Sequence, residues 1–340
     1  MSAIAFQSNN SGFKGRWVKY CEENGIPYKI VDFYAANIIE QLVDCKAVMW
    51  HFNHESPKDF LFAKQLLFSL QQADIKVFPD FNTSWHFDDK VGQKYLLEAL
   101  NIPFVPSYVF YDKKQAIAWA KKASYPKVFK LRGGAGSVNV KKVNSLSEAL
   151  RLINKAFGRG FKHSSLVPFP EMINRYKVGK TSFFSVIKRF IRIFSPTVFT
   201  KNYGRARGYI YFQKFVPDND HDIRVIVIGD KAFAIKRMVR KNDFRASGSG
   251  NILYDKQLFN EREIQLAFEI NDKLKSQCTA MDFVYDKGQP KIVEISYGFS
   301  PEGYDDCPGY WDRDLNWHEG KFNPYVWMVD DLVRNIENNK

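Results

Sequence analysis

Cysteine is scarce in this chain, and long apolar runs are missing. Four cysteines occur among 340 residues, and none forms a Cys-x-x-Cys pair, which argues against a zinc knuckle or a redox dithiol. So few cysteines favour a reducing compartment and therefore predict a cytoplasmic protein. No stretch of about 18 apolar residues is present, so we expect no membrane-spanning segment. The first residues carry neither the basic nor the apolar region of a secretory signal, so we expect no such signal.

Two common catalytic signatures are also missing. No Gly-x-Gly-x-x-Gly follows the first predicted strand, so a dinucleotide site is not indicated. The six histidines are scattered and lack His-Glu-x-x-His spacing, so they predict neither a zinc protease nor a catalytic triad. Surface exposure or packing is the better explanation for each of them.

Apolar strands alternate with amphipathic helices over the first 87 residues, with helices predicted at 14–24, 36–43 and 58–72. This alternation predicts an α/β domain with a parallel sheet. The remaining chain mixes helices with strands that form hairpins, which predicts α+β subdomains. We divide the chain into an N-terminal α/β domain (1–87), a first α+β subdomain (88–154), a basic helical insert (155–208), and a second α+β subdomain that ends in an aromatic tail (209–340).

Most of the net charge of +13 belongs to one region. Residues 155–210 hold twelve Lys and Arg but only one acid, Glu171, so they carry +11 and the rest of the chain carries +2. Charge this localised predicts an anionic partner for the region.

An amphipathic helix is predicted inside this region, at 183–194, with an apolar half that contains Phe183, Ile187, Phe190 and Phe194. An aromatic face opposite a cationic face is typical of a helix at an anionic membrane. We therefore predict a membrane surface or a lipid-linked glycan as a partner of residues 181–194. A core helix with a solvated basic face explains the pattern equally well. Nucleic acid is a less favoured partner, because phenylalanine dominates the region and the rest of the chain is nearly neutral.

A lysine at the end of a predicted strand precedes a glycine-rich loop. Lys130 lies in the strand 127–131, and the loop supplies the candidate residues Gly133, Gly134, Gly136 and Ser137. Glycine lets backbone N–H groups approach phosphate oxygens, and the lysine adds a positive charge. The pattern predicts a nucleotide phosphate site, and an ordinary flexible hairpin with an exposed lysine is the alternative.

A predicted hairpin at 279–296 carries three oxygen-bearing side chains. Asp282 lies on one strand, and Glu294 and Ser296 share a face of the other strand because they are two residues apart. Mg²⁺ prefers few carboxylates together with substrate phosphates, so these three residues are the predicted ligands. A solvated hairpin face is the alternative, but both carboxylates lie within apolar runs, where unpaired charges are unfavourable.

Strands predicted at 209–216, 222–228 and 231–238 form a meander with a further set of polar residues. The first strand leads into a linker able to bind an adenine edge and a ribose, and several cations follow it. Ordinary exposed basic residues are the alternative explanation. The candidates of this region are Gln213, Lys214, Phe215, Val216, Asp222, Arg224, Lys236, Arg237, Arg245, Ala246 and Ser247.

Together these patterns resemble the ATP-grasp superfamily over about residues 88–297, and above all its RimK-like branch, the α-L-glutamate ligases that modify ribosomal protein. The resemblance implies an ATP-grasp fold with ATP and Mg²⁺ as cofactors. It implies that Lys130 binds the α- and β-phosphates, and Lys90 matches a lysine that precedes the first helix in many members. It places the adenine hinge at Lys214, Phe215 and Val216, with Asp222 on the ribose side.

The same resemblance places Arg245, Ala246 and Ser247 near the phosphates and the substrate, with Arg237 and Arg245 as catalytic cations. It assigns Mg²⁺ to Asp282 and Glu294. The chain departs from the glutamate ligases twice. Lys214 replaces a hinge glutamate, and Ser296 stands where those ligases have asparagine, which leaves a second metal position open.

The resemblance implies a reaction in which a carboxylate attacks the γ-phosphate of ATP and an amine then displaces phosphate from the acyl phosphate. We therefore expect a ligase that joins a small-molecule or glycan carboxylate to an amine such as an amino acid, near a membrane. An ATP-grasp kinase that phosphorylates a sugar hydroxyl is an alternative from a second class. A non-catalytic module that binds membrane or nucleic acid is the third possibility.

Overall fold

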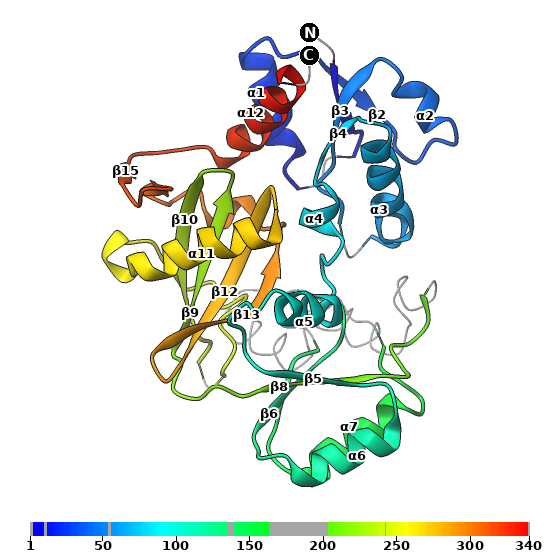
Figure 1. The fold of residues 1–340 in the computed structure, drawn as a ribbon, viewed down its shortest axis with the longest axis vertical. Helices are drawn as coiled ribbons and strands as arrows, with labels where there is room; N and C mark the ends of the chain where they lie inside the picture. The colour runs from blue at the N-terminus through cyan, green and yellow to red at the C-terminus, as the bar shows by residue number, and fades with distance from the viewer. Residues whose placement is uncertain are drawn as a thin grey trace, which may run out of the picture.

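A parallel sheet of four strands forms the N-terminal part of the molecule (Figure 1). The computed structural model describes residues 3–9, 12–53, 56–134, 139–162, 203–241 and 243–338. The strands are β1 (Ala3–Gln7), β2 (Tyr28–Val31), β3 (Cys45–Met49) and β4 (Lys76–Phe78), in the spatial order β2-β1-β3-β4. All neighbouring pairs are parallel, as the alternation of strands and helices predicted.

Helices connect these strands, and the last helix of the chain returns to them. The connecting helices are α1 (Lys14–Glu23), α2 (Ile38–Gln41) and α3 (Pro57–Gln72). α3 begins after Ser56, whose Oγ accepts the Asp59 N–H and so satisfies an amide of the first turn. α12 (Pro324–Glu337) packs against α1 and β4 (Figure 1). Residues from both ends of the sequence therefore build the same domain.

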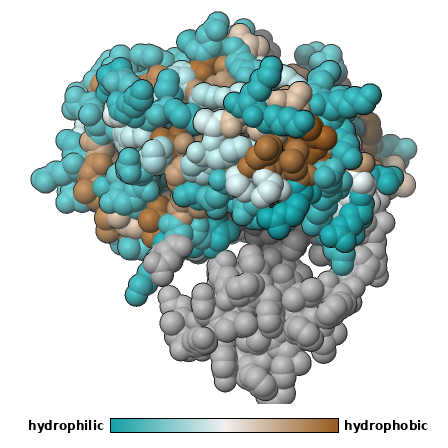
Figure 2. All heavy atoms as spheres, turned by 90° about the horizontal axis from the view of Figure 1, so that it is seen from below, coloured by the Kyte–Doolittle hydropathy of each residue, from teal (hydrophilic) through white to brown (hydrophobic). Residues whose placement is uncertain are grey.

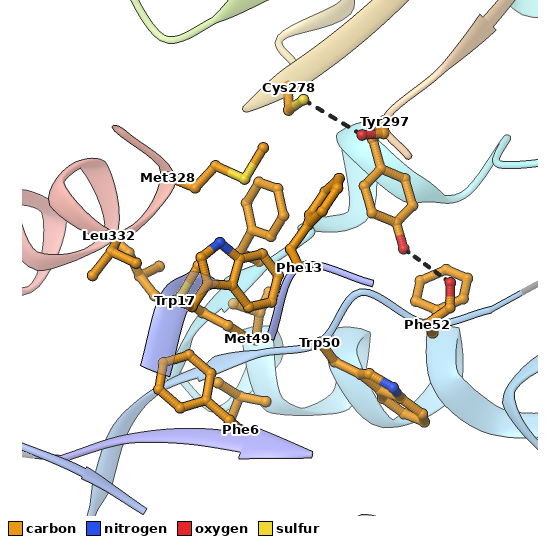
Figure 3. Close-up of a cluster of buried hydrophobic side chains, with 14 of the residues drawn as sticks. Phe6, Phe13, Trp17, Met49, Trp50, Phe52, Cys278, Tyr297, Met328 and Leu332 are labelled. Atoms are coloured by element: carbon orange, nitrogen blue, oxygen red, sulfur yellow. Dashed lines mark hydrogen bonds between the residues drawn. The ribbon is translucent and has the colours of Figure 1, made fainter. Parts of the chain in front are cut away.

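One apolar core joins this domain to the strands that follow it in sequence (Figure 3). Phe13 and Trp17 are fully buried, and their rings meet edge to face with centroids 5.5 Å apart. Tyr297 enters the same core, and its hydroxyl donates a hydrogen bond to the Phe52 carbonyl at 3.5 Å. Complete burial of such a side chain stabilises the fold by roughly 1.5–3 kcal/mol. The core therefore fixes the N-terminal domain against the segment around Tyr297.

The first α+β subdomain is an antiparallel sheet covered by two helices, at the bottom of Figure 1. Its strands are β5 (Ser107–Phe110), β6 (Lys127–Lys130), β7 (Lys141–Val143) and β8 (Ile210–Lys214), in the order β5-β8-β6-β7. Helices α6 (Lys113–Lys122) and α7 (Leu146–Ala156) pack against each other and share an apolar core with the sheet. α7 begins after Ser145, whose Oγ accepts the Glu148 N–H at 3.4 Å, as the sequence pattern indicates.

The second α+β subdomain is a larger antiparallel sheet. Its strands are β9 (His221–Ile228), β10 (Lys231–Met238), β11 (Ile252–Leu253), β12 (Cys278–Asp286), β13 (Gln289–Ser296), β14 (Gly309–Asp312) and β15 (Trp317–Glu319). The order is β13-β12-β9-β10-β14-β15, with β11 paired to β10. Helix α11 (Glu261–Leu274) packs on β9 and β12. The predicted hairpin of β12 and β13 is present, and Lys287 and Gly288 adopt the positive φ that its two-residue turn requires.

The predicted meander of three strands is wrong at its first strand. β8 pairs with β5 and β6, whereas β9 pairs with β10 and β12. Apolar alternation identifies a strand but does not specify its partner, because pairing depends on tertiary packing. The chain therefore crosses from one sheet to the other between β8 and β9.

Short segments tie the two sheets and the N-terminal domain together. They include α4 (Phe81–Ser84), α5 (Lys90–Ala99), and the 3₁₀ turns η1 (Lys256–Leu258) and η2 (Pro301–Gly303). The Val105 N–H donates to the Ile292 carbonyl at 2.8 Å, so the segment before β5 extends the edge of β13. The Gln93 side chain of α5 donates to the Ile295 carbonyl at 2.8 Å. The edge strand β13 is therefore held by both neighbouring units.

The predicted basic insert lies only partly within the described residues. α7 ends at Ala156, and an isolated antiparallel bridge joins Phe161 to Ala206. The predicted helix at 183–194 lies outside the described residues. Among the residues that are described, no helix has the length and apolarity needed to cross a bilayer.

Replacing His86 with Gln should change how stability depends on pH. Burial, and then the nearby Lys64 ammonium, lower the pKa of His86 to about 4. A histidine in an unfolded chain has a pKa near 6.5. Because the folded pKa is the lower one, the unfolded state binds the extra proton, and stability falls as pH drops from about 6.5 to about 4. The free energy of unfolding of the wild type should therefore be about 2 kcal/mol lower at about pH 5 than at about pH 7 because of His86.

Urea unfolding at both pH values measures this difference. His318→Gln is the matched control, because the His318 side chain is 45% exposed. The H86Q protein should lose less stability on acidification than the wild type, whereas H318Q, which lacks the His318–Asp312 pair, should lose at least as much. The same loss in H86Q and wild type would show that His86 does not cause the dependence.

Candidate functional site

A cavity of about 830 Å³ lies between the two α+β subdomains and reaches the N-terminal domain. Its walls include strand residues of β6, β8, β9, β12 and β13, which are far apart in sequence. The predicted site residues that line it are Lys90, Lys130, Gly134, Gln213, Lys214, Phe215, Val216, Asp222, Arg224, Arg245, Ala246, Ser247, Asp282, Glu294 and Ser296. The fold therefore gathers most of the predicted residues around one space.

Some predicted residues lie elsewhere. Arg237 of β10 is behind the cavity wall, where it contacts Asp222 and Asp282. Lys236 is its neighbour along β10, and adjacent strand residues point to opposite faces. Gly133 is also not part of the lining, and Gly136 and Ser137 lie outside the described residues. The cavity thus contacts the first part of the glycine loop through Gly134.

Two buried lysines face one wall of the cavity. Lys130 ends β6 and is 6% exposed, and burial lowers its pKa to about 8 against the opposing effect of Glu294. Burial alone would also lower the pKa of Lys90, but Glu294 at 2.9 Å and Asp88 raise it. Because two lysines line this wall beside the Glu294 carboxylate, it suits a polyanionic ligand.

The residues just before α5 hold the glycine loop in place. Asp88 accepts the Gly134 N–H at 2.8 Å, and Lys90 donates to the Gly134 carbonyl at 3.0 Å. Asp89 forms a bidentate ion pair with Arg132, with 2.9 Å between Arg132 Nε and Asp89 Oδ1. These contacts connect the start of the first subdomain to the loop that follows β6.

Asp88 is a site residue that the sequence patterns missed. It lines the cavity, and a Cβ built on Gly133 would lie only 2.9 Å from its Oδ2, so the loop needs glycine there. Asp88 itself has a φ of +52°, a conformation that Asp adopts more readily than most residues. The charged run Asp88-Asp89-Lys90 was visible in the sequence. The contact between Asp88 and Gly134 was not, because it depends on the tertiary fold.

Asp282 lies at the centre of a network of buried charges. Its carboxylate accepts hydrogen bonds from Arg224 at 2.5 and 2.7 Å and lies 2.9 Å from Arg237 Nη2. Arg237 also forms two hydrogen bonds with Asp222, both at 2.7 Å. Burial alone would raise the pKa of Asp282, but the two guanidinium groups hold it well below its usual range. The network therefore keeps Asp282 ionised inside the protein.

Of the hairpin carboxylates, Glu294 suits a Mg²⁺ that is shared with a phosphate ligand, whereas both Asp282 oxygens already accept hydrogen bonds from arginine. Asp282 and Glu294 are directly opposite in the β12–β13 ladder, and both line the cavity. Two carboxylates with phosphate oxygens form a donor set that Mg²⁺ prefers. Glu294 is the more accessible of the two, with 30% of its side chain exposed. Within the described residues, no group of three or more His, Cys, Asp and Glu is arranged around one point, so ligand or water oxygens must complete the shell.

Ser296 is engaged in a local turn beside this pair. Its Oγ donates to the Gly298 carbonyl at 3.0 Å and accepts the Gly298 N–H at 3.1 Å. A hydroxyl occupied in this way has little capacity left for a metal. Ser296 lines the cavity, and its hydrogen bonds go to the backbone of its own loop.

The segment after β8 forms an apolar slot. Lys214 pairs with Asp286 of β12 at one end of the slot. Lys142 of β7 lies over the Phe215 ring, 4.0 Å from its centroid. Val216 lines the slot, together with the valines Val105, Val128, Val284 and Val293. An apolar space lined by these side chains suits a flat aromatic ligand.

The loop after β10 closes another side of the cavity. Arg245 forms a bidentate ion pair with Asp243, with 2.8 Å between Nε and Oδ2. The Ser247 carbonyl accepts a hydrogen bond from Arg240 at 2.7 Å, and Ala246 is buried. The loop is therefore held by its own charged residues, with the Arg245 side chain at the cavity.

The N-terminal domain supplies a wall that sequence analysis did not predict. Gly12, His51 and Asn53 line the cavity, and they follow the carboxyl ends of β1 and β3. β2 lies on one side of β1 and β3 lies on the other side. The strand order therefore reverses between β1 and β3. Parallel sheets bind ligands in the crevice at such a point. Ser300 and Glu302 line the cavity as well, so a second ligand has polar groups on this side.

Replacing Asp282 with Asn should destabilise the fold more than replacing Glu294 with Gln. Asp282 neutralises two buried arginines, and loss of one partner of a buried ion pair costs about 3–5 kcal/mol. Lys90 retains Asp88 and the Gly134 carbonyl when Glu294 becomes neutral, so a smaller loss is expected there. Urea unfolding of the two isosteric variants measures the difference. Equal stabilities would contradict a central role for the Asp282 network.

The chain is similar in sequence to RimK-like proteins. A family model for the RimK-like ATP-grasp domain matches residues 200–304, which contain β8 to β13. The α-aminoadipate–LysW ligase LysX of Saccharolobus solfataricus is 24% identical over 228 residues, which are 67% of this chain and 67% of that protein.

Solved structures share the fold over nearly the whole chain. The biotin carboxylase domain of 2-oxoglutarate carboxylase from Hydrogenobacter thermophilus, solved with MgADP and bicarbonate, has a TM-score of 0.62 at 14% identity and covers 98% of this chain and 70% of its own. D-alanine–D-alanine ligase from Bacillus anthracis, solved with ATP, has a TM-score of 0.59 at 12% identity. The match covers 99% of this chain and 98% of the ligase. These likenesses confirm the predicted fold. The chain therefore has the fold of these structures, and its residues 200–304 match the RimK-like ATP-grasp domain.

Proposed function

We propose that the protein is an ATP- and Mg²⁺-dependent ligase that joins a carboxylate to an amine. The observation that carries this proposal is the cavity wall where Lys130, Lys90 and Glu294 meet. The lysines suit the phosphates of a nucleotide, and Glu294 suits the Mg²⁺ that accompanies them. The apolar slot at Phe215 suits the adenine ring. Both LysX and D-alanine–D-alanine ligase are ligases by name, which supports the same class of reaction here.

The reaction proceeds in two steps. A carboxylate oxygen of the first substrate attacks the γ-phosphorus of ATP, the bond to the bridging oxygen breaks, and ADP leaves. The amine nitrogen then attacks the acyl carbon of the acyl phosphate. The carbon–oxygen bond to phosphate breaks, phosphate leaves, and the nitrogen loses a proton. Neither step needs a nucleophile from the protein, so catalysis depends on positioning and charge neutralisation.

Different residues of the cavity have different roles in these two steps. Lys130 binds the phosphates, and Lys90 holds Glu294 and the glycine loop in position. Arg245 stabilises the charge on the transferred phosphoryl group. Arg237 is a positioning residue, because it contacts Asp282 and does not line the cavity. Mg²⁺, when bound at Glu294 and Asp282, would neutralise part of the phosphate charge.

The carboxylate and the amine bind on the side formed by the N-terminal domain. His51, Asn53 and Ser300 line this part of the cavity, which suits polar substrates such as amino acids. LysX and D-alanine–D-alanine ligase act on amino acids by name, so an amino acid is our choice of amine. A glycan carboxylate, and a location at a membrane through residues 181–194, are further parts of the proposal that rest on sequence alone.

A phosphate-release screen with Mg·ATP tests the proposal. The protein should release phosphate only when a suitable carboxylate and an amino acid are both present. Hydroxylamine should replace the amine and trap the acyl phosphate as a hydroxamate. ADP formation with a phosphorylated sugar and no free phosphate would instead identify a kinase. ATP binding without turnover in a broad screen of carboxylates, amines and sugars would favour a binding module.

Replacing Lys130 with Ala should weaken ATP binding and lower turnover by about 10²–10³-fold. Loss of one preorganised charged group that stabilises the transition state typically lowers turnover by about this factor. Lys46→Ala, an exposed lysine on the N-terminal domain, is the matched control and should leave both quantities unchanged. Calorimetry and steady-state kinetics provide the measurements. Unchanged ATP affinity in a folded K130A protein would refute the phosphate role of Lys130.

Replacing Asp88 with Asn should tighten ATP binding by about tenfold. The Asp88 carboxylate occupies the Gly134 N–H and places a negative charge beside the proposed phosphate position. Removing that charge lowers the repulsion, and a tenfold change corresponds to about 1.4 kcal/mol. Glu98→Gln, at the exposed end of α5, is the control. Calorimetric titration with ATP measures the effect, and weaker binding in D88N would show that Asp88 supports the bound state.

A further inference from the structure

The first subdomain carries a large excess of positive charge. Its described residues, 104–134, 139–162 and 203–214, contain sixteen Lys and Arg but only two acids, Asp112 and Glu148, for a net charge of +14. The whole chain has a net charge of +13, so all other residues together sum to −1. The basic region is therefore a folded body that includes α6 and α7, and it extends well beyond residues 155–210.

Only a few of these cations line the cavity or pair with residues beside it. Lys130 and Lys214 line it, and Arg132 is paired with Asp89. Seven of the other exposed cations have no acid of the described chain within ion-pair distance. We call these residues the basic face: Lys113, Lys114, Lys121, Lys122, Arg151, Arg159 and Arg207.

The basic face lies on the outside of the two helices. α6 and α7 direct small and apolar residues inward, among them Ala116, Ala120, Ala149 and Ile153, which are fully buried. Their lysines and Arg151 are on the opposite, exposed sides. Arg159 and Arg207 flank the bridge between Phe161 and Ala206, just after α7. Figure 2 views the molecule from this end, and most of the coloured surface is hydrophilic.

We propose that the basic face docks on the surface of an anionic phospholipid membrane. Each Lys or Arg close to such a surface contributes about 1 kcal/mol, so a group of seven is sufficient for reversible binding. The sequence of the segment between residues 162 and 203 adds seven basic residues against one acid. The charge of the described face therefore continues into the sequence of that segment.

The described residues favour a membrane over a nucleic acid. Proteins that bind single strands stack bases on exposed aromatic rings. In the described part of the first subdomain, Tyr111 alone is an exposed large apolar or aromatic side chain. The cavity does not extend to the basic face, because none of the seven residues lines it. A broad array of cations without aromatic platforms is suited to lipid head groups.

Vesicle sedimentation with the full-length protein tests this inference. The wild type should bind phosphatidylcholine vesicles that contain phosphatidylglycerol and should not bind pure phosphatidylcholine, and added salt should weaken binding. A variant with K114Q, K121Q, K122Q and R151Q should bind about 10²–10³-fold more weakly. A control with K46Q, K273Q, K287Q and K321Q loses the same charge from exposed lysines elsewhere and should bind nearly as well as the wild type.

Several outcomes would overturn the inference. One is equal weakening in both quadruple variants, because net charge alone would then explain binding. Another is undiminished binding of the K114Q, K121Q, K122Q and R151Q variant. A third is tight binding to duplex RNA without any vesicle binding. The inference does not depend on the proposed reaction, because vesicle binding requires no turnover, and an unchanged circular dichroism spectrum shows that each variant is folded.

Discussion

The Asp282 carboxylate, held between Arg224 and Arg237, is the interaction around which the second subdomain is organised. The register of the central strands places Asp282 opposite Arg224 on β9 and opposite Glu294 on β13. A shift of one residue in either pairing would leave charged groups buried without partners, which is strongly unfavourable. The charge network therefore specifies the strand register that also positions Glu294 at the cavity. Any Mg²⁺ that binds at Asp282 must compete with the two guanidinium groups for its oxygens.

A second constraint connects the N-terminal half of the chain to the glycine loop. Asp88 and Lys90 bind the two sides of the Gly134 peptide unit, and Asp89 pairs with Arg132. These residues follow the N-terminal domain directly, so they connect that domain to the glycine loop. The same domain presents His51 and Asn53 to the opposite part of the cavity. The proposed substrate and phosphate positions are thus connected through one short segment.

Local patterns were sufficient to predict the elements that depend on neighbours in sequence. The hairpin with Asp282 and Glu294 could be predicted because its turn residues and its alternation lie within 18 residues. The glycine loop and the parallel N-terminal sheet were predicted for the same reason. The overall ATP-grasp fold was expected from the family resemblance that these motifs carry.

The remaining features depend on contacts between distant residues. The pairing of β8 with β5, the contact of Asp88 with Gly134 and the approach of His51 to the cavity have no signature in the local sequence. The charge of the basic insert was assigned to residues 155–210 because charge can be counted only along the chain. Folding brings the lysines of α6 beside α7, so the basic surface is larger than the segment that first indicated it.

The measurement that tests the central claim most directly is a crystal structure with Mg²⁺ and a non-hydrolysable ATP analogue. The account predicts the adenine ring in the slot at Phe215 and Val216, the phosphates beside Lys130 and the Gly134 backbone, and Mg²⁺ bound through Glu294. Nucleotide bound at another surface, or phosphates that contact neither Lys130 nor a metal held by Glu294, would contradict it.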